Sequence, residues 1–401
     1  MAERALIGLL LAVCLATGAR AQELPQDEIQ LNLSGYFDNF DVTVIYPNVS
    51  LTKRVGEKTS LTGRYLVDMV SAASIRNASS TGTGGGGDDD DERERGQRVD
   101  AVSAASSRGG GLGGQVISGP DDIRHELSGG ITQIVAGRLV SMNGIYSHEN
   151  DYASATIAGS ITQYLARKNT TLQLGIVRSW DRSFPTGENW TRTKDVFTVS
   201  GSLSQIISRR LIMQGLYSYS DNSGYLADPY KKVTIGGTEY ESASPDSRIR
   251  QAAALRGIYR LNAASTIQLG YRFYWDTWNV QSHTVSVNYN RHMAPAVDLG
   301  VGVRSYLQGA ADFYEPSYSI LQNFMTVDSK LDQAVSTEFQ FDLTLLGGKG
   351  LEGWALLEDD RAQINLSLNI YQRQTANPDS YSNRRGLVAA YFNVGLRYKL
   401  E

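Results

Sequence analysis

The chain has almost no cysteine: Cys14 is the only one among 401 residues. It lies in an apolar run, Ala5 to Ala16, that follows Arg4 and precedes Ala19-Arg20-Ala21. A basic residue, about a dozen apolar residues and small residues at a cleavage site are typical of a secretory signal peptide. We therefore expect residues 1–21 to be removed. The remaining chain has no thiol, which excludes a disulfide scaffold, a cysteine metal site and a cysteine nucleophile.

Long apolar runs are also missing. No stretch reaches the ~18 consecutive apolar residues that predict a transmembrane helix, and the run in the signal peptide is too short for a membrane anchor. The mean hydropathy of −0.29 fits a water-soluble protein, or a β-barrel in which only alternate residues face lipid.

The charge balance excludes another class of partner. The chain has 38 basic and 42 acidic residues, and removing Arg4, Arg20 and Glu3 with the signal peptide leaves 36 and 41, a net charge of −5. Domains that bind nucleic acid carry a basic excess, so we expect no nucleic-acid partner.

Groups for catalysis are scarce, since the whole chain has four histidines. Ser282 precedes His283, but successive side chains of a strand point to opposite faces, so the two should not pair. We expect no enzyme activity and no cofactor. An outer-membrane hydrolase that uses His283 and Asp276 is the remaining alternative, and replacing those two residues would test it.

An acidic run, residues 88–92, raises the question of a divalent cation, because such ions bind clustered carboxylates. The run lacks the spaced ligands of a calcium loop and follows four glycines. We expect a solvated loop and no metal site, and the sequence leaves open whether the run binds divalent cations.

Alternation of apolar and polar residues dominates the remainder, most clearly from Thr266 to Leu307. Apolar residues there occupy every second position: Ile267, Leu269, Tyr271, Phe273 and Trp275, then Val285, Val287 and Tyr289, then Val297, Leu299, Val301 and Val303. A period of two predicts β-strands, and the short turns between them predict an antiparallel meander. Its apolar face must be covered by a second sheet or by lipid.

The same pattern recurs from Ile29 to Leu400 and predicts about sixteen strands, to within two. It is interrupted at 72–120, a glycine-rich and acidic segment that we expect to be a long, partly disordered loop. Short connections, such as 262–264, alternate with long ones, such as 221–247 and 308–333. This asymmetry is typical of outer-membrane barrels, with short periplasmic turns and long extracellular loops. We predict an all-β fold in which residues 22–401 form a single antiparallel transmembrane β-barrel.

The apolar parity of the predicted strands is almost without charge, and the charged residues crowd the opposite parity. An arginine or lysine that faces lipid at mid-bilayer costs about 2–4 kcal/mol, so we expect these charges to line the lumen. The candidate lumen charges are Arg64, Asp68, Arg124, Glu126, Arg256, Arg260, Arg272, Asp276, Asp298, Arg304, Glu338, Asp342 and Arg397. A selective pore often carries a ring of one sign, whereas mixed signs favour structural ion pairs, and both interpretations stay open.

Several segments together resemble one family of bacterial outer-membrane proteins, Domain of Unknown Function 3570 (DUF3570). They are the paired Val-Asp-x-Val-Ser-Ala-Ala-Ser at 67–74 and 99–106, Asp122-Ile123-Arg124-His125-Glu126, Gly224-Tyr225-Leu226-Ala227-Asp228-Pro229-Tyr230-Lys231, Tyr274-Trp275-Asp276-Thr277-Trp278 with Ser282-His283-Thr284, and Val303-Arg304-Ser305-Tyr306-Leu307-Gln308 leading to Ala310-Ala311-Asp312-Phe313-Tyr314. The resemblance covers nearly the whole mature chain. It implies an outer-membrane β-barrel and brings no activity, substrate or catalytic residue.

Two features depart from that family. The acidic, glycine-rich insert at 82–98 is particular to this sequence, and the chain ends Tyr398-Lys399-Leu400-Glu401 where barrels usually end on an aromatic residue. The implied surroundings are the bacterial outer membrane, reached by a cleaved signal peptide, with outer-membrane lipid and the barrel assembly machinery as partners.

The loop motif gives a second set of candidate residues: Tyr225, Leu226, Asp228, Pro229, Tyr230 and Lys231. Patterned loops are stronger functional hints than patterned cores. This one could form a binding surface, fold inward as a plug, or pack to stabilise the rim. Two functions follow as hypotheses: a pore or transport component for small solutes, or a structural barrel that docks an envelope protein through its extracellular loops.

Overall fold

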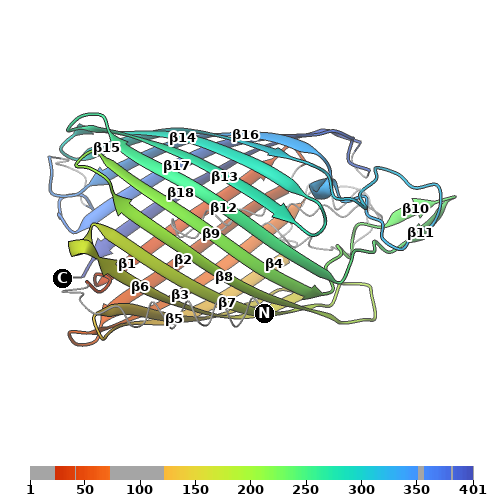
Figure 1. Ribbon diagram of the computed structural model, residues 1–401, viewed down its shortest axis with the longest axis horizontal. Coiled ribbons are helices and arrows are strands. Elements are labelled where there is room, and N and C mark those ends of the chain that lie inside the picture. Colours follow the sequence, from red (N-terminus) through yellow and green to blue (C-terminus); the bar gives the residue numbers. More distant parts are fainter. Residues whose placement is uncertain (1–22, 41, 73–121, 351–355, 381–382, 401) are drawn as a thin grey trace, which may run out of the picture.

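The computed structural model describes residues 23–40, 42–72, 122–350, 356–380 and 383–400. Sixteen of its strands close into one antiparallel barrel, and two more form a separate hairpin (Figure 1). The prediction of an all-β barrel of about sixteen strands is confirmed. The predicted signal peptide, the 72–120 loop beyond Ala72 and the acidic run 88–92 lie outside the described residues.

The alternating segments of the sequence coincide with these strands. The barrel strands are β1 (Glu28–Asp38), β2 (Val42–Arg54), β3 (Thr59–Ala72), β4 (Asp122–Val135), β5 (Arg138–His148), β6 (Tyr152–Leu165), β7 (Thr170–Ser183), β8 (Arg192–Ile206), β9 (Leu211–Gly224), β12 (Ser247–Arg260), β13 (Ser265–Asp276), β14 (Gln281–Ala294), β15 (Val297–Gln308), β16 (Ala334–Leu346), β17 (Ala362–Thr375) and β18 (Gly386–Lys399). Two short 3₁₀ turns, η3 (Ala166–Lys168) and η4 (Ser329–Leu331), lie in connections.

Each strand pairs with its neighbours along the chain, and β9 pairs with β12 across an inserted hairpin, β10 (Val233–Ile235) and β11 (Thr238–Tyr240). The barrel closes where β1 pairs with β18, from Glu28 opposite Lys399 to Asp38 opposite Ala389. Closure leaves no strand edge unpaired, which is what a sheet surrounded by lipid requires.

The connections differ at the two ends of the barrel, as the sequence predicts. At one end they are short, except for the connection 347–361 between β16 and β17. Ala136 and Gly137 alone join β4 to β5, with φ of 50° and 74°, and a two-residue type I′ hairpin needs positive φ at both positions. At the other end lie the long loops 225–246 and 309–333, with β10 and β11 projecting beyond the rim (Figure 1). We call these the short-turn end and the long-loop end.

The outer face of the barrel is apolar. On β12 to β15 the residues exposed there are Leu255, Tyr259, Leu269, Tyr271, Val285, Val287, Leu299, Val301, Val303 and Leu307. These are the apolar positions of the period-two pattern, so the residues between them face the lumen. Among the described residues no helix is long and apolar enough to cross a membrane.

Candidate functional site in the lumen and its mouth

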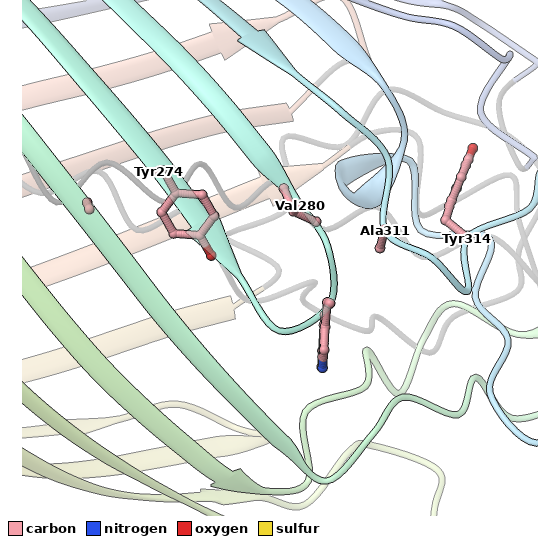
Figure 2. Close-up of a cluster of buried hydrophobic side chains, with 6 residues drawn as sticks. Tyr274, Val280, Ala311 and Tyr314 are labelled. Atoms are coloured by element: carbon pink, nitrogen blue, oxygen red, sulfur yellow. The ribbon is translucent and has the colours of Figure 1, made fainter. Parts of the chain in front are cut away.

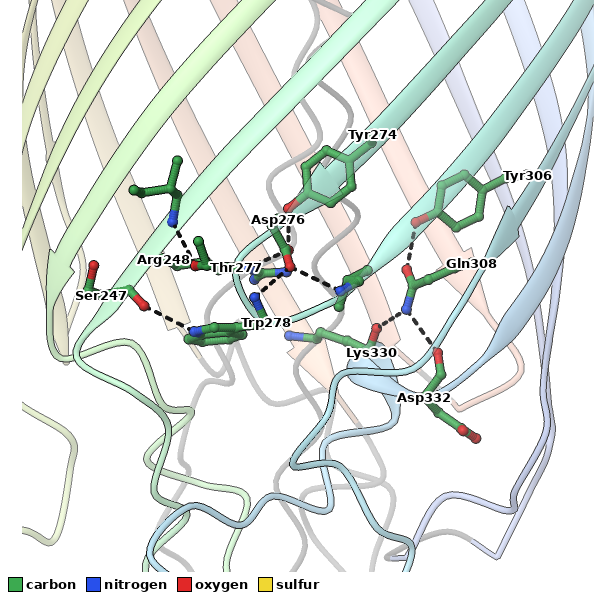
Figure 3. Close-up of polar contacts among 12 residues, drawn as sticks. Ser247, Arg248, Tyr274, Asp276, Thr277, Trp278, Tyr306, Gln308, Lys330 and Asp332 are labelled. Atoms are coloured by element: carbon green, nitrogen blue, oxygen red, sulfur yellow. Dashed lines mark hydrogen bonds and ion pairs between the residues drawn. The ribbon is translucent and has the colours of Figure 1, made fainter. Parts of the chain in front are cut away.

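Asp276, one of the predicted lumen charges, is the centre of a polar network at the long-loop end of the lumen (Figure 3). It ends β13, and its side chain is fully buried. Its carboxylate accepts hydrogen bonds from Arg248 at 2.5 and 2.8 Å and from the Tyr274 hydroxyl at 2.6 Å. It also accepts from the backbone N–H groups of Trp278 and Val280, and so shapes the turn between β13 and β14. Asp276 therefore stabilises the long-loop end of the lumen, which we call the mouth.

Arg248, which sequence reasoning did not select, completes this network. Its guanidinium carbon lies 4.2 Å from the centre of the Trp278 ring, a cation–π arrangement. The Trp278 Nε1 in turn donates to the carbonyl of Ser247 at 3.1 Å (Figure 3). Trp278 is thus turned into the mouth, whereas Trp180 lies exposed on the outer face.

The η4 turn is fixed to the inner wall nearby. Gln308 Nε2 donates to the carbonyls of Lys330 and Asp332, both at 2.8 Å (Figure 3). Arg373 Nη2 donates to the carbonyl of Ser329 at 3.0 Å. Because β15 and β17 both contribute, the end of the 309–333 loop is held inside the rim.

Several other predicted lumen charges form ion pairs between strands. Arg124 pairs with Asp68 at 2.9 Å and approaches Glu149 at 3.8 Å, which joins β4 to β3. Arg304 pairs with Glu338 at 3.4 Å and Arg397 with Glu28 at 2.5 Å. Pairs of opposite sign on adjacent strands hold the wall in register, which is the structural interpretation of the mixed signs.

Two predicted lumen charges lie near the short-turn end. Asp298 accepts from His292 Nδ1 at 2.6 Å beside the bulge that ends the β14–β15 ladder. Arg260 donates to the carbonyl of Arg209 at 2.7 Å. Both are exposed. They belong to the rim, away from the mouth network.

The remaining candidates lie at inward positions along the wall. Arg272 is buried, with its guanidinium carbon 5.5 Å from the centre of the Tyr274 ring. The others, Arg64, Glu126, Arg256 and Asp342, are half-buried. The strand register places Arg256, Arg304 and Glu338 in one row across the paired strands, through Gly270 and Ser286. The candidates as a group do not form a ring of one sign.

The predicted loop motif, 225–231, packs against the other loops and is not a free surface. The Tyr230 hydroxyl hydrogen-bonds Asp151, and Lys231, which is buried, pairs with Asp379 at 3.6 Å. Tyr225 meets the Trp190 ring edge-on at 5.1 Å. One short segment thereby contacts the loops that follow β5, β7 and β17. Of the three interpretations left open by the sequence, packing at the mouth describes this geometry best.

A first hydrophobic cluster joins the loops to the wall (Figure 2). Its buried residues are Ala252, Tyr274, Trp278, Val280, Ala311 and Tyr314. Asp312 accepts from Asn279 Nδ2 at 2.9 Å beside it. The segments Tyr274 to Trp278 and Ala310 to Tyr314, both noted in the sequence, are therefore contact partners in the mouth.

A second cluster lies between the two long loops themselves. It contains Val233, Tyr318, Met325 and Val327, all buried. Ala243 and Met325 exchange backbone hydrogen bonds of 2.9 and 2.8 Å. The Tyr318 hydroxyl donates to the carbonyl of Thr326 and accepts from the Thr326 N–H. Loops 225–246 and 309–333 thus form one folded unit, which we call the cap.

The sequence does carry a signal for part of the cap. Val233 to Tyr240 contains Gly236-Gly237 between two short β-prone runs, and two glycines at that spacing predict a tight hairpin. Their φ values of 57° and 84° are left-handed, as such a turn requires. Our prediction of a plain loop over 221–247 missed this hairpin.

Carboxylates gather where the cap meets the barrel. Burial raises the pKa of Asp228, and nearby Asp328 raises it further, while the Lys330 ammonium acts in the opposite direction. Burial also raises the pKa of Tyr314, which faces Asp332, Asp379 and Asp328. Burial raises the pKa of Tyr225 to about 12. The mouth is thus a partly desolvated site in which Lys231 and Lys330 offset several carboxylates.

The residues of the alternative hydrolase lie on different faces. His283 is exposed on the outer face, where its Nδ1 lies 2.8 Å from the Tyr271 hydroxyl. Ser282 and Asp276 are buried on the inner face. In the described part of the chain, histidine, cysteine, aspartate and glutamate side chains form no group of three or more suited to a metal ion.

Comparison with solved structures reveals a similar fold at low sequence identity. The chain superposes on CdiB from Acinetobacter baumannii with a TM-score of 0.50 and 9% identity, covering 94% of this chain and 61% of that one. For the siderophore receptor PirA from Pseudomonas aeruginosa the TM-score is 0.46 and the identity 11%. That match covers 93% of this chain and 62% of the receptor, so the chain spans less than two thirds of the receptor's length. For OmpT, an outer-membrane protein of Vibrio cholerae, the TM-score is 0.41 and the identity 10%, and the match covers 94% of this chain and 99% of that one. No curated protein matches the sequence.

The family comparison is more specific. The model described as "Protein of unknown function (DUF3570)" matches residues 2–197 and 178–391. These two matches cover most of the chain and include every segment on which the resemblance rests. The fold is that of an outer-membrane β-barrel, and the chain belongs to the DUF3570 family.

Proposed function

We propose that this chain is a barrel of the outer membrane that conducts small solutes, with a mouth narrowed by its own cap. The observation that carries the proposal is the chemistry of the inner wall. The inward face is polar along its length while the outer face is apolar. Barrels of sixteen or more strands typically leave an aqueous channel, and a polar lining keeps that channel wet.

The location can be tested first. Membrane fractionation should find the protein in the outer membrane, and mass spectrometry of the intact protein should give a chain that starts at Gln22. Recovery in the inner membrane, or an uncleaved N-terminus, would contradict this part of the proposal. Partners expected on this basis are outer-membrane lipid and the barrel assembly machinery.

Conduction is tested with purified full-length protein in planar lipid bilayers. We expect stepwise current increases, and a larger unit conductance when loop 225–246 is replaced by a short glycine-serine linker, because that loop supplies half of the cap. A matched control replaces only the tip, Gly236-Gly237, by Asn-Gly, which keeps the hairpin turn. Folded protein without any channel activity would remove the proposal.

A second candidate function is docking of an envelope protein by the cap. The observation in its favour is an apolar tip on the cap: Ile320, Leu321 and Phe324 are 67%, 61% and 45% exposed. Exposed apolar groups on an ordered surface often mark a protein interaction site. Because the tip is carried by a loop with its own hydrophobic cluster, it is presented in a fixed position.

Docking predicts that replacing Ile320, Leu321 and Phe324 by serine abolishes co-purification of a cross-linked partner. The control replaces Gln322 and Asn323, which lie in the same tip, by serine. If the two variants and the parent protein capture the same proteins, the docking function is wrong.

We propose no enzymatic role. His283 is separated by the barrel wall from Ser282 and Asp276, and a base must lie within hydrogen-bonding reach of its nucleophile. The test measures ester and peptide hydrolysis by the parent and by His283→Ala. Hydrolysis that is lost in this variant would reverse the proposal.

A further inference from the structure

An apolar groove crosses the outer face of the barrel at the seam between β1 and β18. Its volume is about 520 Å³. Leu31 and Val49 line it with exposed side chains, and Leu356, which belongs to the connection between β16 and β17, lines it as well and is 62% exposed. The groove is thus a hollow in the face that the fold turns toward lipid.

The groove runs across the strands rather than along them. Five of its lining residues form one row through five paired strands: Ile364 of β17, Leu396 of β18, Leu31 of β1, Val49 of β2 and Tyr65 of β3. Neighbouring strands lie ~4.8 Å apart, so the steps of this row span about 19 Å. Counted from the short-turn end, Ile364 is the third residue of its strand and Tyr65 the seventh. The groove therefore rises obliquely from the short-turn end to the middle of the wall.

Pro47 lies at the upper end of the groove, where the pairing of β2 with β3 is interrupted. The ladder between these strands omits Tyr46 and Pro47 and has the same register on both sides of them. Proline has no N–H to donate and is normally confined to sheet edges, which a closed barrel does not have. A ligand packed over Val49 and Tyr65 would contact both strands beside this interruption.

The lower end of the groove lies near the boundary between lipid and water. Tyr398 follows Leu396 at the next outward position of β18. Its hydroxyl donates to Asp359 at 2.7 Å, and the guanidinium carbon of Arg361 lies 4.9 Å from the centre of its ring. Tyrosine is enriched at membrane–water interfaces, where its ring is in the apolar layer and its hydroxyl is hydrated. A lipid whose tail enters the groove here has its headgroup at the level of Tyr398.

From this geometry we infer that the groove binds one acyl chain of a phospholipid from the leaflet at the short-turn end. Half of the hydrocarbon core is ~15 Å thick, and an oblique path of about 19 Å suits a tail that ends at the middle of the bilayer. Lipid tails are as apolar as the groove, so close packing holds the tail, and the hydrophobic effect does not. The inference requires the proposed membrane location and does not depend on conduction.

The experiment uses the mature full-length protein in vesicles of phosphatidylethanolamine and phosphatidylglycerol. A trace of the phosphatidylethanolamine carries a photoactivatable diazirine, either at the end of one acyl chain or next to its carbonyl. After irradiation and digestion, mass spectrometry locates the adducts. We expect the terminal probe to label the peptides around Pro47 and Tyr65, and the carbonyl-proximal probe to label those around Leu356 and Leu396. The labelling there should exceed that of the outward residues of β7 to β9.

A variant that fills the groove, Val49→Trp, tests the assignment further. Its matched control is Val301→Trp, on the outer face of β15 away from the groove, because Val49 and Val301 are 41% and 39% exposed. A tail that loses on the order of ten atom contacts binds roughly tenfold more weakly, so Val49→Trp should lower the yield of groove adducts by about that factor. Val301→Trp should leave the yield unchanged. Heat-modifiable migration verifies that both variants are folded.

The position of the adducts in the parent protein tests the inference without any variant. Adducts spread evenly over the outer face would overturn it, and so would terminal-probe adducts confined to the short-turn end. A groove yield that Val49→Trp leaves unchanged, or that both variants lower equally, would also overturn it. A barrel that binds the tail but conducts nothing would contradict the proposed conduction alone.

Discussion

Arg248 of β12 and Asp276 of β13 form a buried ion pair, with 2.5 Å between Nη2 and the carboxylate, at the point where the barrel wall meets the cap. Asp276→Ala should destabilise the protein by about 3–5 kcal/mol, because it leaves a buried guanidinium without its counter-charge. Urea unfolding in detergent micelles measures the change. The double variant with Arg248→Ala should cost less than the sum of the single variants.

The control for this pair is Asp298→Ala, which removes another predicted lumen charge whose partner, His292, is exposed. Exposed pairs contribute ~0–1 kcal/mol, so this variant should unfold close to the parent. Equal destabilisation by Asp276→Ala and Asp298→Ala would contradict the structural role assigned to Asp276.

The packing of the loop at Asp228 should depend on pH. Burial raises the pKa of Asp228 above its value in a released loop, so the packed loop binds the proton more tightly. At neutral pH the ionised group therefore opposes packing, and this cost disappears as pH falls through the raised pKa. Amide hydrogen exchange in 226–235, corrected for intrinsic rates, should become slower on acidification.

Asp228→Asn removes the charge but keeps an acceptor for the Tyr230 N–H, which Asp228 now binds at 2.9 Å. We expect this variant to show slow exchange already at neutral pH, with the pH dependence reduced. Glu239→Gln, on the exposed strand β11, is the control and should behave like the parent. A steeper pH dependence in Asp228→Asn would disprove the assignment.

The turn before β17 should respond to pH in the opposite direction. Hydrogen bonds from Arg361 and from the Tyr398 hydroxyl, at 2.7 to 3.1 Å, hold the pKa of Asp359 below its usual range. A lowered folded-state pKa adds stability that is present above the unfolded pKa and is lost as pH falls through the folded value. Asp359→Asn should lower the urea midpoint at neutral pH, and the difference should vanish in strong acid.

The adjacent Asp360→Asn serves as the comparison for Asp359. It makes the same chemical change one residue away in the same turn. If the two variants lose the same stability at neutral pH, the effect is not specific to the contacts of Asp359.

The seam between β1 and β18 should tolerate no side chain at Gly35. A Cβ there would lie 2.6 Å from the ring of Phe392, its partner across the seam, and Phe392 also stacks on Phe37 at 6.1 Å. Gly35→Val should therefore cost about 1–3 kcal/mol through displacement of the ring. Urea midpoints and the rate of barrel folding into vesicles measure it.

Gly63→Val is the matched control, since Gly63 also has the outward parity and a Cβ there meets nothing within 4 Å. Phe392→Leu should rescue Gly35→Val in part by removing the clash. A rescue that fails, with Gly63→Val equally harmful, would show that the cost arises from β-branching rather than from Phe392.

Much of this fold follows from the sequence because the signal is local. Alternation from Ile267 to Val303 assigns each residue to lipid or lumen without reference to other strands, since the period of a strand is set by its own backbone. The lengths of connections such as 262–264 and 309–333 assign the two ends in the same way. The family motifs agree with these assignments.

The tertiary structure decided what those inward residues do. Arg248 and Asp276 are 28 positions apart, and the pairing of β12 with β13 brings them together. Lys231 and Asp379 are much farther apart in the sequence, and the packing of their loops brings them together. No sequence period relates either pair. The period-two pattern assigns Asp276 to the lumen because that pattern is local. In the structure its carboxylate is bound by Arg248 and by the backbone N–H groups of the turn. The hairpin at Gly236-Gly237 was visible in the sequence, but its packing on 309–333 was not. Side-chain direction is a local property of the backbone, whereas burial and pairing depend on which distant segments share the same space.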